Sequence, residues 1–196
     1  MKIDFQRFTA PLIATMFRGS LPEFQAAPMR KVIDVGLAHG RSVPEIAYAL
    51  ATGYHETQRF LRMTEIGAGA NKIYGQPLRT WSNETQTYFG RGIPQLTWLG
   101  NYGRQTARLS ARLGRPVDLV NNPGLAADPE ISAEILWDGM IFGTFTGKSL
   151  ADYFAQGRKD YVGARAIINR NDQDALIASY AEQFEAALTG AALVTA

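Results

Sequence analysis

The 196-residue sequence contains no cysteine and only two histidines, and both shortages narrow the chemistry open to it. Without cysteine there can be no disulfide, no thiolate nucleophile and no cysteine-ligated zinc. Two histidines, His39 and His55, are too few for a histidine-rich metal site. The segment HETQR at 55–59 also departs from the H-E-x-x-H zinc motif, because its last residue is Arg59. We therefore expect no metal site.

The sequence also lacks a strong excess of charge and any long apolar run. Its formal net charge is +2, whereas nucleic-acid-binding proteins usually carry a larger, clustered positive charge, so we expect no nucleic-acid partner. No window approaches the roughly 18 apolar residues of a membrane-spanning helix. Asp4 and Arg7 lie within the first residues, and they are not followed by the uninterrupted apolar segment of a secretory signal. These features predict folding in the cytoplasm and no stable membrane association.

Helix signals, by contrast, are frequent. The chain is 46% hydrophobic, which suits one folded domain over residues 1–196. Two S-x-x-E capping boxes with proline in the first turn start at Ser20 and Ser42. The first predicted helix should be bent or broken at Pro28. Further helices are predicted over 101–113, from Asp128, from Ser149, and over 161–168 and 172–188.

The helical pattern stops between residues 62 and 92, where glycines and Pro77 interrupt short β-prone pieces. Loops this long within a compact domain are usually functional. The sequence therefore predicts a mainly α, or α+β, domain with a small β and loop lobe at roughly 62–92 inserted in the helical body.

Two carboxylates flank the start of this predicted lobe. Glu56 ends an apolar helical segment, and Glu65 follows nine residues later in the glycine-rich loop. Glycoside hydrolysis needs such a pair, with a protonated acid in apolar surroundings and an ionised partner in wetter ones. The alternative is that both are solvated surface glutamates, as most glutamates are.

A second candidate is the segment YFGRGIPQLTW at 88–98. Its two glycines allow a polymer to approach the backbone closely. Gln95 and Thr97 alternate to one side, where they could bind sugar hydroxyls or hold a water, and Tyr88 and Trp98 could stack on sugar rings. The alternative is a turn between a strand and a helix, with the aromatic residues in the core. Asn169, between two predicted helices, is either a cap or turn residue or an amide directed into a groove.

Four segments follow one another along the chain: HET at 55–57, YFGRGIPQLTWLGNYGR at 88–104, VDLVNNPGLAADPEISAEILWDGM at 117–140 and ARAIIN at 164–169. In this order they resemble glycoside hydrolase family 19, and the resemblance covers roughly residues 45–188. The family holds plant-type chitinases and a branch of bacteriophage endolysins. The resemblance implies a lysozyme-like, two-lobed, mainly helical fold with a groove between the lobes, an inverting mechanism and no cofactor.

The resemblance also implies a role for each matching residue. Glu56 would be the general acid and Glu65 the general base, with Glu84 as an alternative base because it is closer to the 88–98 segment. Thr97 would position the attacking water. The implied substrate-binding residues are Gln95, Asn101 and Asn169, supported by His55, Tyr88 and Arg91.

The chain departs from the chitinases of this family in three ways, because it lacks their disulfides, has short loops near the pair, and carries Gly100 where many have tyrosine. It is more similar to the compact endolysin branch. We therefore expect a monomeric endolysin, with no separate wall-binding domain, that hydrolyses the β-1,4 MurNAc–GlcNAc bond of peptidoglycan glycan strands. It would wait in the host cytoplasm until its release to the cell wall. The alternatives are a chitinase and a non-catalytic glycan-binding protein.

Overall fold

The computed structural model describes residues 1–169 and 172–193, and over these residues the chain is mainly helical with a small β-containing part, as predicted. The α-helices are α1 (Phe5–Thr15), α2 (Glu23–Ala38), α3 (Val43–Glu56), α4 (Leu99–Leu113), α5 (Pro129–Phe142), α6 (Ala151–Phe154), α7 (Tyr161–Ala164) and α8 (Asp174–Ala191). The 3-10 helices are η1 (Ile66–Gly69), η2 (Ile73–Gly75), η3 (Pro123–Ala127) and η4 (Arg165–Ile167). The strands are β1 (Lys2–Ile3), β2 (Leu78–Arg79), β3 (Thr85–Gln86) and β4 (Ala192–Leu193).

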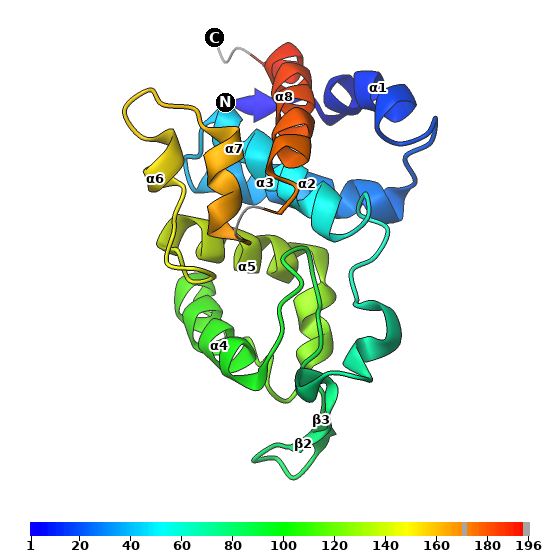
Figure 1. Cartoon of the computed structure of the whole chain (residues 1–196), viewed down its shortest axis with the longest axis vertical. Helices are drawn as coiled ribbons and strands as arrows, with labels where there is room; N and C mark the ends of the chain where they lie inside the picture. Colours follow the sequence, from blue (N-terminus) through cyan, green and yellow to red (C-terminus); the bar gives the residue numbers. More distant parts are fainter. Residues whose placement is uncertain (170–171, 194–196) are drawn as a thin grey trace.

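Helices α1, α2, α3 and α8 form the wide upper part of the molecule, which we call the helical lobe (Figure 1). Nine consecutive residues of α3, Ile46–Tyr54, are buried. Helix α8 packs along α3 and α1, and the Phe8 and Phe184 rings stack 6.2 Å apart between α1 and α8. The burial of this stretch fixes the direction of α3, and its last two residues, His55 and Glu56, emerge partly exposed from the core.

The segment from residue 62 to 128 forms a second, smaller lobe below, which includes α4 and the β2–β3 hairpin (Figure 1). The hairpin is antiparallel and pairs Leu78 with Gln86. This small lobe has its own apolar core, which includes Tyr88, Tyr102 and Leu119. The core continues past the predicted 62–92 segment into α4 and η3, because their apolar faces cover the loop.

Helix α5 lies between the two lobes and supplies side chains to both cores. Ala133, Leu136 and Trp137 belong to the larger core, and Ile131 and Ile135 to the smaller one. The Trp137 indole donates to the Val32 carbonyl at 2.9 Å. A helix that is apolar nearly all round its circumference is expected at such a position.

The predicted helix N-termini at Ser42 and Asp128 were confirmed, and the capping box predicted at Ser20 was wrong. Ser42 forms a complete capping box with Glu45, and Asp128 accepts from the backbone of Glu130 and Ile131. At α2 the cap residue is Pro22, with no side-chain hydrogen bond, so the predicted box at Ser20 is not formed.

The predicted break at Pro28 is also absent, because α2 is one continuous helix through that residue. Pro28 removes one backbone donor, but its ring is buried, and Met29 and Val32 beside it lie in the larger core. Burial of that helix face outweighs the local cost of the proline.

At the top of the molecule the two-residue strands β1 and β4 pair antiparallel, which places Lys2 beside Leu193 (Figure 1). Within the part of the chain that the structure describes, none of the helices is both long enough and apolar enough to cross a membrane.

Candidate active site

Glu56 is the last residue of α3, and the sequence after it forces the helix to stop there. The Thr57 hydroxyl donates to the Gly53 carbonyl and accepts from the Phe60 amide. Gln58, Arg59 and Phe60 then all have positive φ angles, between 52° and 69°. Three successive non-glycine residues in this region are strained, and such strain is concentrated at functional sites. The turn leads the chain away sharply and leaves Glu56 at the helical lobe's lower edge.

The Glu56 carboxylate forms an ion pair with Arg165, a residue distant in the sequence. Arg165 Nη1 donates to Glu56 Oε1 at 2.7 Å. The Arg165 side chain is 2% exposed, whereas that of Glu56 is 21% exposed. Arg165 Nε also donates to the Asp172 carbonyl at 2.8 Å. Since Oε1 is occupied and no contact is found for Oε2 among the described residues, Oε2 is the atom available to a ligand.

Glu65 is held by the small lobe through both of its carboxylate oxygens. Tyr74 donates its hydroxyl to Oε1 at 2.8 Å, and the Gly90 amide donates to Oε2 at 3.0 Å. The Glu65 amide in turn donates to the Gly90 carbonyl at 2.8 Å. The hydrogen bond to Glu65 raises the pKa of the Tyr74 hydroxyl, so Tyr74 remains a donor. The carboxylate is therefore fixed in one orientation.

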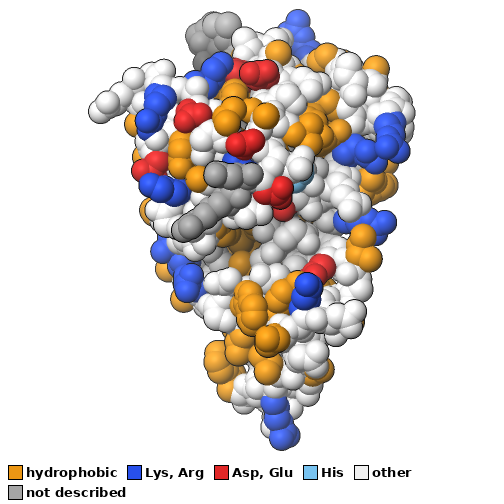
Figure 2. All heavy atoms as spheres, in the orientation of Figure 1, with side chains coloured by type: hydrophobic (Ala, Val, Ile, Leu, Met, Phe, Trp, Pro, Cys, Tyr) orange, Lys and Arg blue, Asp and Glu red, His pale blue; other side chains and the backbone are white. Residues whose placement is uncertain are grey.

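The two glutamates line one hollow of about 260 Å³, together with Gln58, Arg62, Thr64, Ile66 and Gln95. Glu56 enters it from the helical lobe and Glu65 from the small lobe, as a carboxylate pair across a groove requires. On the face shown in Figure 2, acidic side chains gather in the upper half of the molecule, and a separate one lies below them nearer the tapered end. Glu84, the alternative base, is instead exposed beside the β2–β3 hairpin and does not line this hollow.

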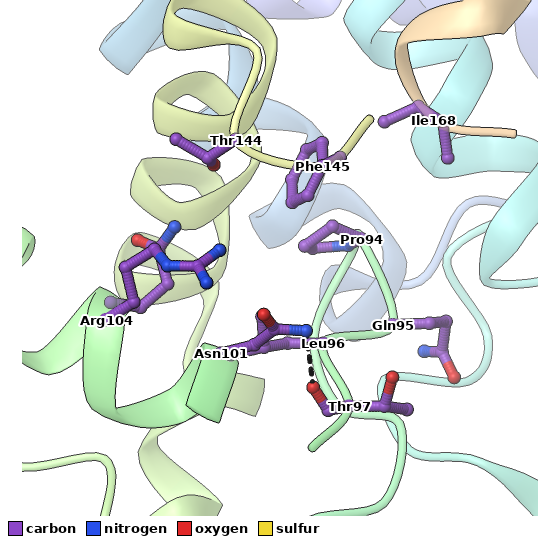
Figure 3. Close-up of a pocket in the computed structure, with 10 residues that line it drawn as sticks. Pro94, Gln95, Leu96, Thr97, Asn101, Arg104, Thr144, Phe145 and Ile168 are labelled. Atoms are coloured by element: carbon purple, nitrogen blue, oxygen red, sulfur yellow. Dashed lines mark hydrogen bonds between the residues drawn. The ribbon is translucent and has the colours of Figure 1, made fainter. Parts of the chain in front are cut away.

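Gln95 also lines a second hollow, so the two adjoin at this residue. Thr97 and Asn101 line the second hollow, where Asn101 Nδ2 donates to the Thr97 carbonyl at 2.9 Å (Figure 3). The Gln95 amide is anchored by Nε2, which donates to the Gly92 carbonyl at 2.9 Å. The structure thus places Gln95 between the carboxylate pair and the residues predicted to bind sugar. Thr97 lines the second hollow and not the one that the carboxylates share.

Tyr88 and Arg91 do not line either hollow, so neither side chain is placed to meet a ligand there directly. Tyr88 is 1% exposed, donates to the Val120 carbonyl at 3.0 Å and packs edge-on against Tyr102. Arg91 is also buried and donates to the Thr87 carbonyl and the Tyr102 hydroxyl. Burial of both side chains in the small lobe's core makes them supports of the 88–98 loop.

His55 and Asn169 lie near the site but outside the carboxylate hollow. His55 lines a separate depression with Tyr54 and Tyr180 on the helical lobe. Asn169 is exposed, and its backbone amide donates to the Arg165 carbonyl at 3.0 Å. The neighbouring Ile168 lines the second hollow. A ligand that fills this hollow therefore passes close to Asn169.

Two residues that hold the carboxylates, Arg165 and Tyr74, were not among the predicted site residues. Arg165 lies within the ARAIIN segment, and its position four residues before Asn169 was the only available signal. Tyr74 belongs to a β-prone piece of the loop that carried no chemical signal of its own.

No protein-family model matches this chain, and no curated protein sequence matches it either. Across residues 1–169 and 172–193, no three histidine, aspartate or glutamate side chains come together as metal ligands would.

Proposed function

We propose that the protein is an inverting glycoside hydrolase that cleaves the β-1,4 MurNAc–GlcNAc bond of peptidoglycan. The observation that carries the proposal is the shared hollow of Glu56 and Glu65, each fixed by a different lobe. The ordered resemblance of four sequence segments to glycoside hydrolase family 19 supports the same reaction. That resemblance also supports a lysozyme-like arrangement and the biological role of a phage endolysin released from the host cytoplasm.

In the proposed reaction Glu56 protonates the glycosidic oxygen as the bond from the anomeric carbon breaks. The proton would leave from Oε2, because Oε1 is held by Arg165. Glu65 takes a proton from a water that attacks the anomeric carbon from the opposite face. The new carbon–oxygen bond forms with inversion, and an inverting pair needs a separation of about 6.5–9.5 Å to accommodate the water. The hollow of about 260 Å³ exceeds what one water needs.

Gln95 is the residue best placed to order that water. Its Nε2 is tied to the Gly92 carbonyl, and its φ of +51° marks a strained backbone. Thr97, the implied water-positioning residue, lines the adjoining hollow and would act on the sugar bound there.

Digestion of purified peptidoglycan, followed by mass spectrometry of the fragments, tests the proposal. Reducing-end MurNAc is expected from wild-type protein. Glu56→Gln and Glu65→Gln should each lower kcat by about 10²–10⁴-fold, the usual contribution of a general acid or base. Glu84→Gln is the matched control and should retain wild-type activity, because Glu84 lies outside the hollow.

Three results would overturn the proposal. Wall digestion unaffected by Glu56→Gln would remove the general acid. Cleavage of soluble chitin oligosaccharides without cleavage of walls would make the protein a chitinase. Binding of glycan with no cleavage of either substrate would make it a glycan-binding protein.

A further inference from the structure

The second hollow has polar groups that the proposed reaction does not use. Its volume is about 290 Å³, and it runs from Gln95 toward the loop after α5 (Figure 3). Arg104, Gln105 and Thr144 line it without any role in the carboxylate chemistry. Among the described residues Arg104 has no counter-ion, and Gln105 and Thr144 each carry a buried side-chain oxygen without a hydrogen-bond partner.

Helix α4 carries three arginines at intervals of four residues, Arg104, Arg108 and Arg112. Among the described residues, Arg104 alone of the three has no counter-ion. Arg108 and Arg112, one and two turns later, pair with Asp138 at 2.7 Å and 3.1 Å. Within the described ranges, no carboxylate oxygen lies within 4.0 Å of a nitrogen of Arg104, whose side chain faces the hollow (Figure 3). The hollow therefore offers a guanidinium to an anion, and this group binds carboxylates with two parallel hydrogen bonds.

Gln105 adds a buried acceptor. Its side chain is 2% exposed, and Nε2 donates to Asp138 Oδ2 at 3.1 Å. The reverse orientation would place two oxygens together, so Asp138 fixes the amide and leaves Oε1 as the unused atom. Oε1 has no partner among the described residues, and the same holds for the Thr144 hydroxyl. Buried polar atoms without partners are rare. Both residues belong to the wall of the hollow, so a small shift of either side chain would offer its oxygen to a donor there.

The remaining wall of the hollow is apolar. Phe145, Ile168 and Pro94 face Arg104 and Asn101 across it (Figure 3). The pocket thus combines a hydrocarbon surface, acceptors for N–H groups and a cation. A short amide-containing chain that carries a carboxylate matches all three.

Building on the proposed function, we infer that this hollow binds the acidic substituent on the lactyl ether of muramic acid, with its carboxylate on Arg104. An amide N–H of the substituent would donate to Gln105 Oε1, and its methyl groups would lie against Phe145. Chitin has no such substituent and no anion at any position. Arg104 is therefore the residue that favours peptidoglycan over chitin at a site shared by both sugars.

The carboxylate has two possible sources, a residue of the stem peptide or the lactyl group itself after the peptide is removed. Binding is measured by calorimetry in the Glu56→Gln background, so that hydrolysis of the fragments is slowed by about 10²–10⁴-fold. The probes are soluble glycan fragments with stem peptides, the same fragments after amidase treatment, and chitin tetrasaccharide. The fragments that lose affinity with Arg104→Gln identify the source.

Arg104→Gln should weaken binding of at least one carboxylate-bearing probe by about tenfold or more, as expected for a lost charge-assisted hydrogen bond. Binding of chitin tetrasaccharide should stay unchanged, and Arg104→Lys should restore part of the loss. Arg7→Gln is the control for net charge, because Arg7 is exposed on α1 in the other lobe. Circular dichroism and Tm confirm that each variant is folded.

Equal binding of all probes by Arg104→Gln and its parent would overturn the inference, and so would a lack of binding to every carboxylate-bearing probe. If wild-type protein fails to cleave walls while binding still depends on Arg104, the proposed reaction is wrong and the inference about the hollow stands.

Discussion

Arg165 Nη1 lies 2.7 Å from Glu56 Oε1, although the two residues are 109 positions apart in the sequence. The arginine is almost fully buried and the glutamate opens into the hollow that it shares with Glu65. Arg165 therefore acts as a fixed anchor that sets the orientation of the carboxylate. In the proposed reaction this anchor determines which oxygen faces the sugar.

Replacement of Arg165 by lysine should lower kcat by about 10²-fold with little change in KM. The lysine keeps the charge but cannot donate to Glu56 Oε1 and the Asp172 carbonyl at once, so Glu56 loses its fixed position. A displacement of about 1 Å at a reacting group costs about this much. Steady-state kinetics on soluble glycan fragments provides the measurement. An unchanged kcat would show that the ion pair only stabilises the fold.

Tyr74→Phe should lower kcat by about tenfold by releasing Glu65 Oε1, while the ring contact with Trp98 is retained. Because its hydrogen bond raises the pKa of Tyr74 above the ordinary value of 10.0, the hydroxyl is a donor throughout the range below that pH. The ratio of wild-type to variant kcat should accordingly be constant between about pH 7 and 10.0, where glutamates with ordinary pKa values are ionised. A ratio that varies strongly with pH would assign Tyr74 a titrating role instead.

Gly92→Ala should destabilise the protein by about 1–3 kcal/mol, the usual cost of overpacking. Gly92 has a φ of +73°, and an added Cβ would collide with the Ala126 carbonyl and lie 2.8 Å from Ser132 Oγ. Gly100→Ala is the matched control, since nothing lies within 4 Å of its added Cβ. On α4 that substitution should be neutral or stabilise by up to about 1 kcal/mol. Urea denaturation of both variants gives the comparison, and equal effects would contradict the close packing at Gly92.

Tyr48→Phe should cost about 1–3 kcal/mol near neutral pH, because the buried hydroxyl donates to the Ala164 carbonyl at 2.7 Å. Burial raises the pKa of Tyr48 well above its ordinary 10.0. The stabilising contribution of the neutral hydroxyl is thus complete below pH 10.0 and is lost as the pH rises above that value. The stability difference between wild type and variant should shrink between pH 9 and about 11. A constant difference would mean that the pKa of Tyr48 is the same in the folded and the unfolded chain, so that burial does not raise it.

The helical part of the fold was predictable where the signal was local. Ser42 and Asp128 each cap a helix with donors two or three residues away, so the sequence alone specifies both starts. The same pattern begins at Ser20, but the cap predicted there was wrong because Pro22 occupies the N-cap position of α2. Pro28 was misjudged because the burial that overrides it comes from a core assembled by distant residues.

The carboxylate pair was predictable as a pair, because Glu56 ends an apolar helix and Glu65 follows within a loop of limited length. Its supports were not predictable, since the partners of both glutamates are contributed by other elements: Arg165 by η4 and Tyr74 by η2. The burial of Tyr88 and Arg91 was not predictable for a similar reason. For an aromatic or basic residue in a loop, the sequence does not distinguish a side chain that faces a groove from one that is buried in a small core.

Helix α5 contributes side chains to the cores of both lobes, and this sharing has a thermodynamic consequence. Neither lobe can melt without exposing one face of α5, so loss of one core removes the support of the other. Heating should then give a single calorimetric transition with equal van't Hoff and calorimetric enthalpies, as for a domain that unfolds in one two-state transition. The groove that the lobes enclose would survive up to that temperature and disappear with it.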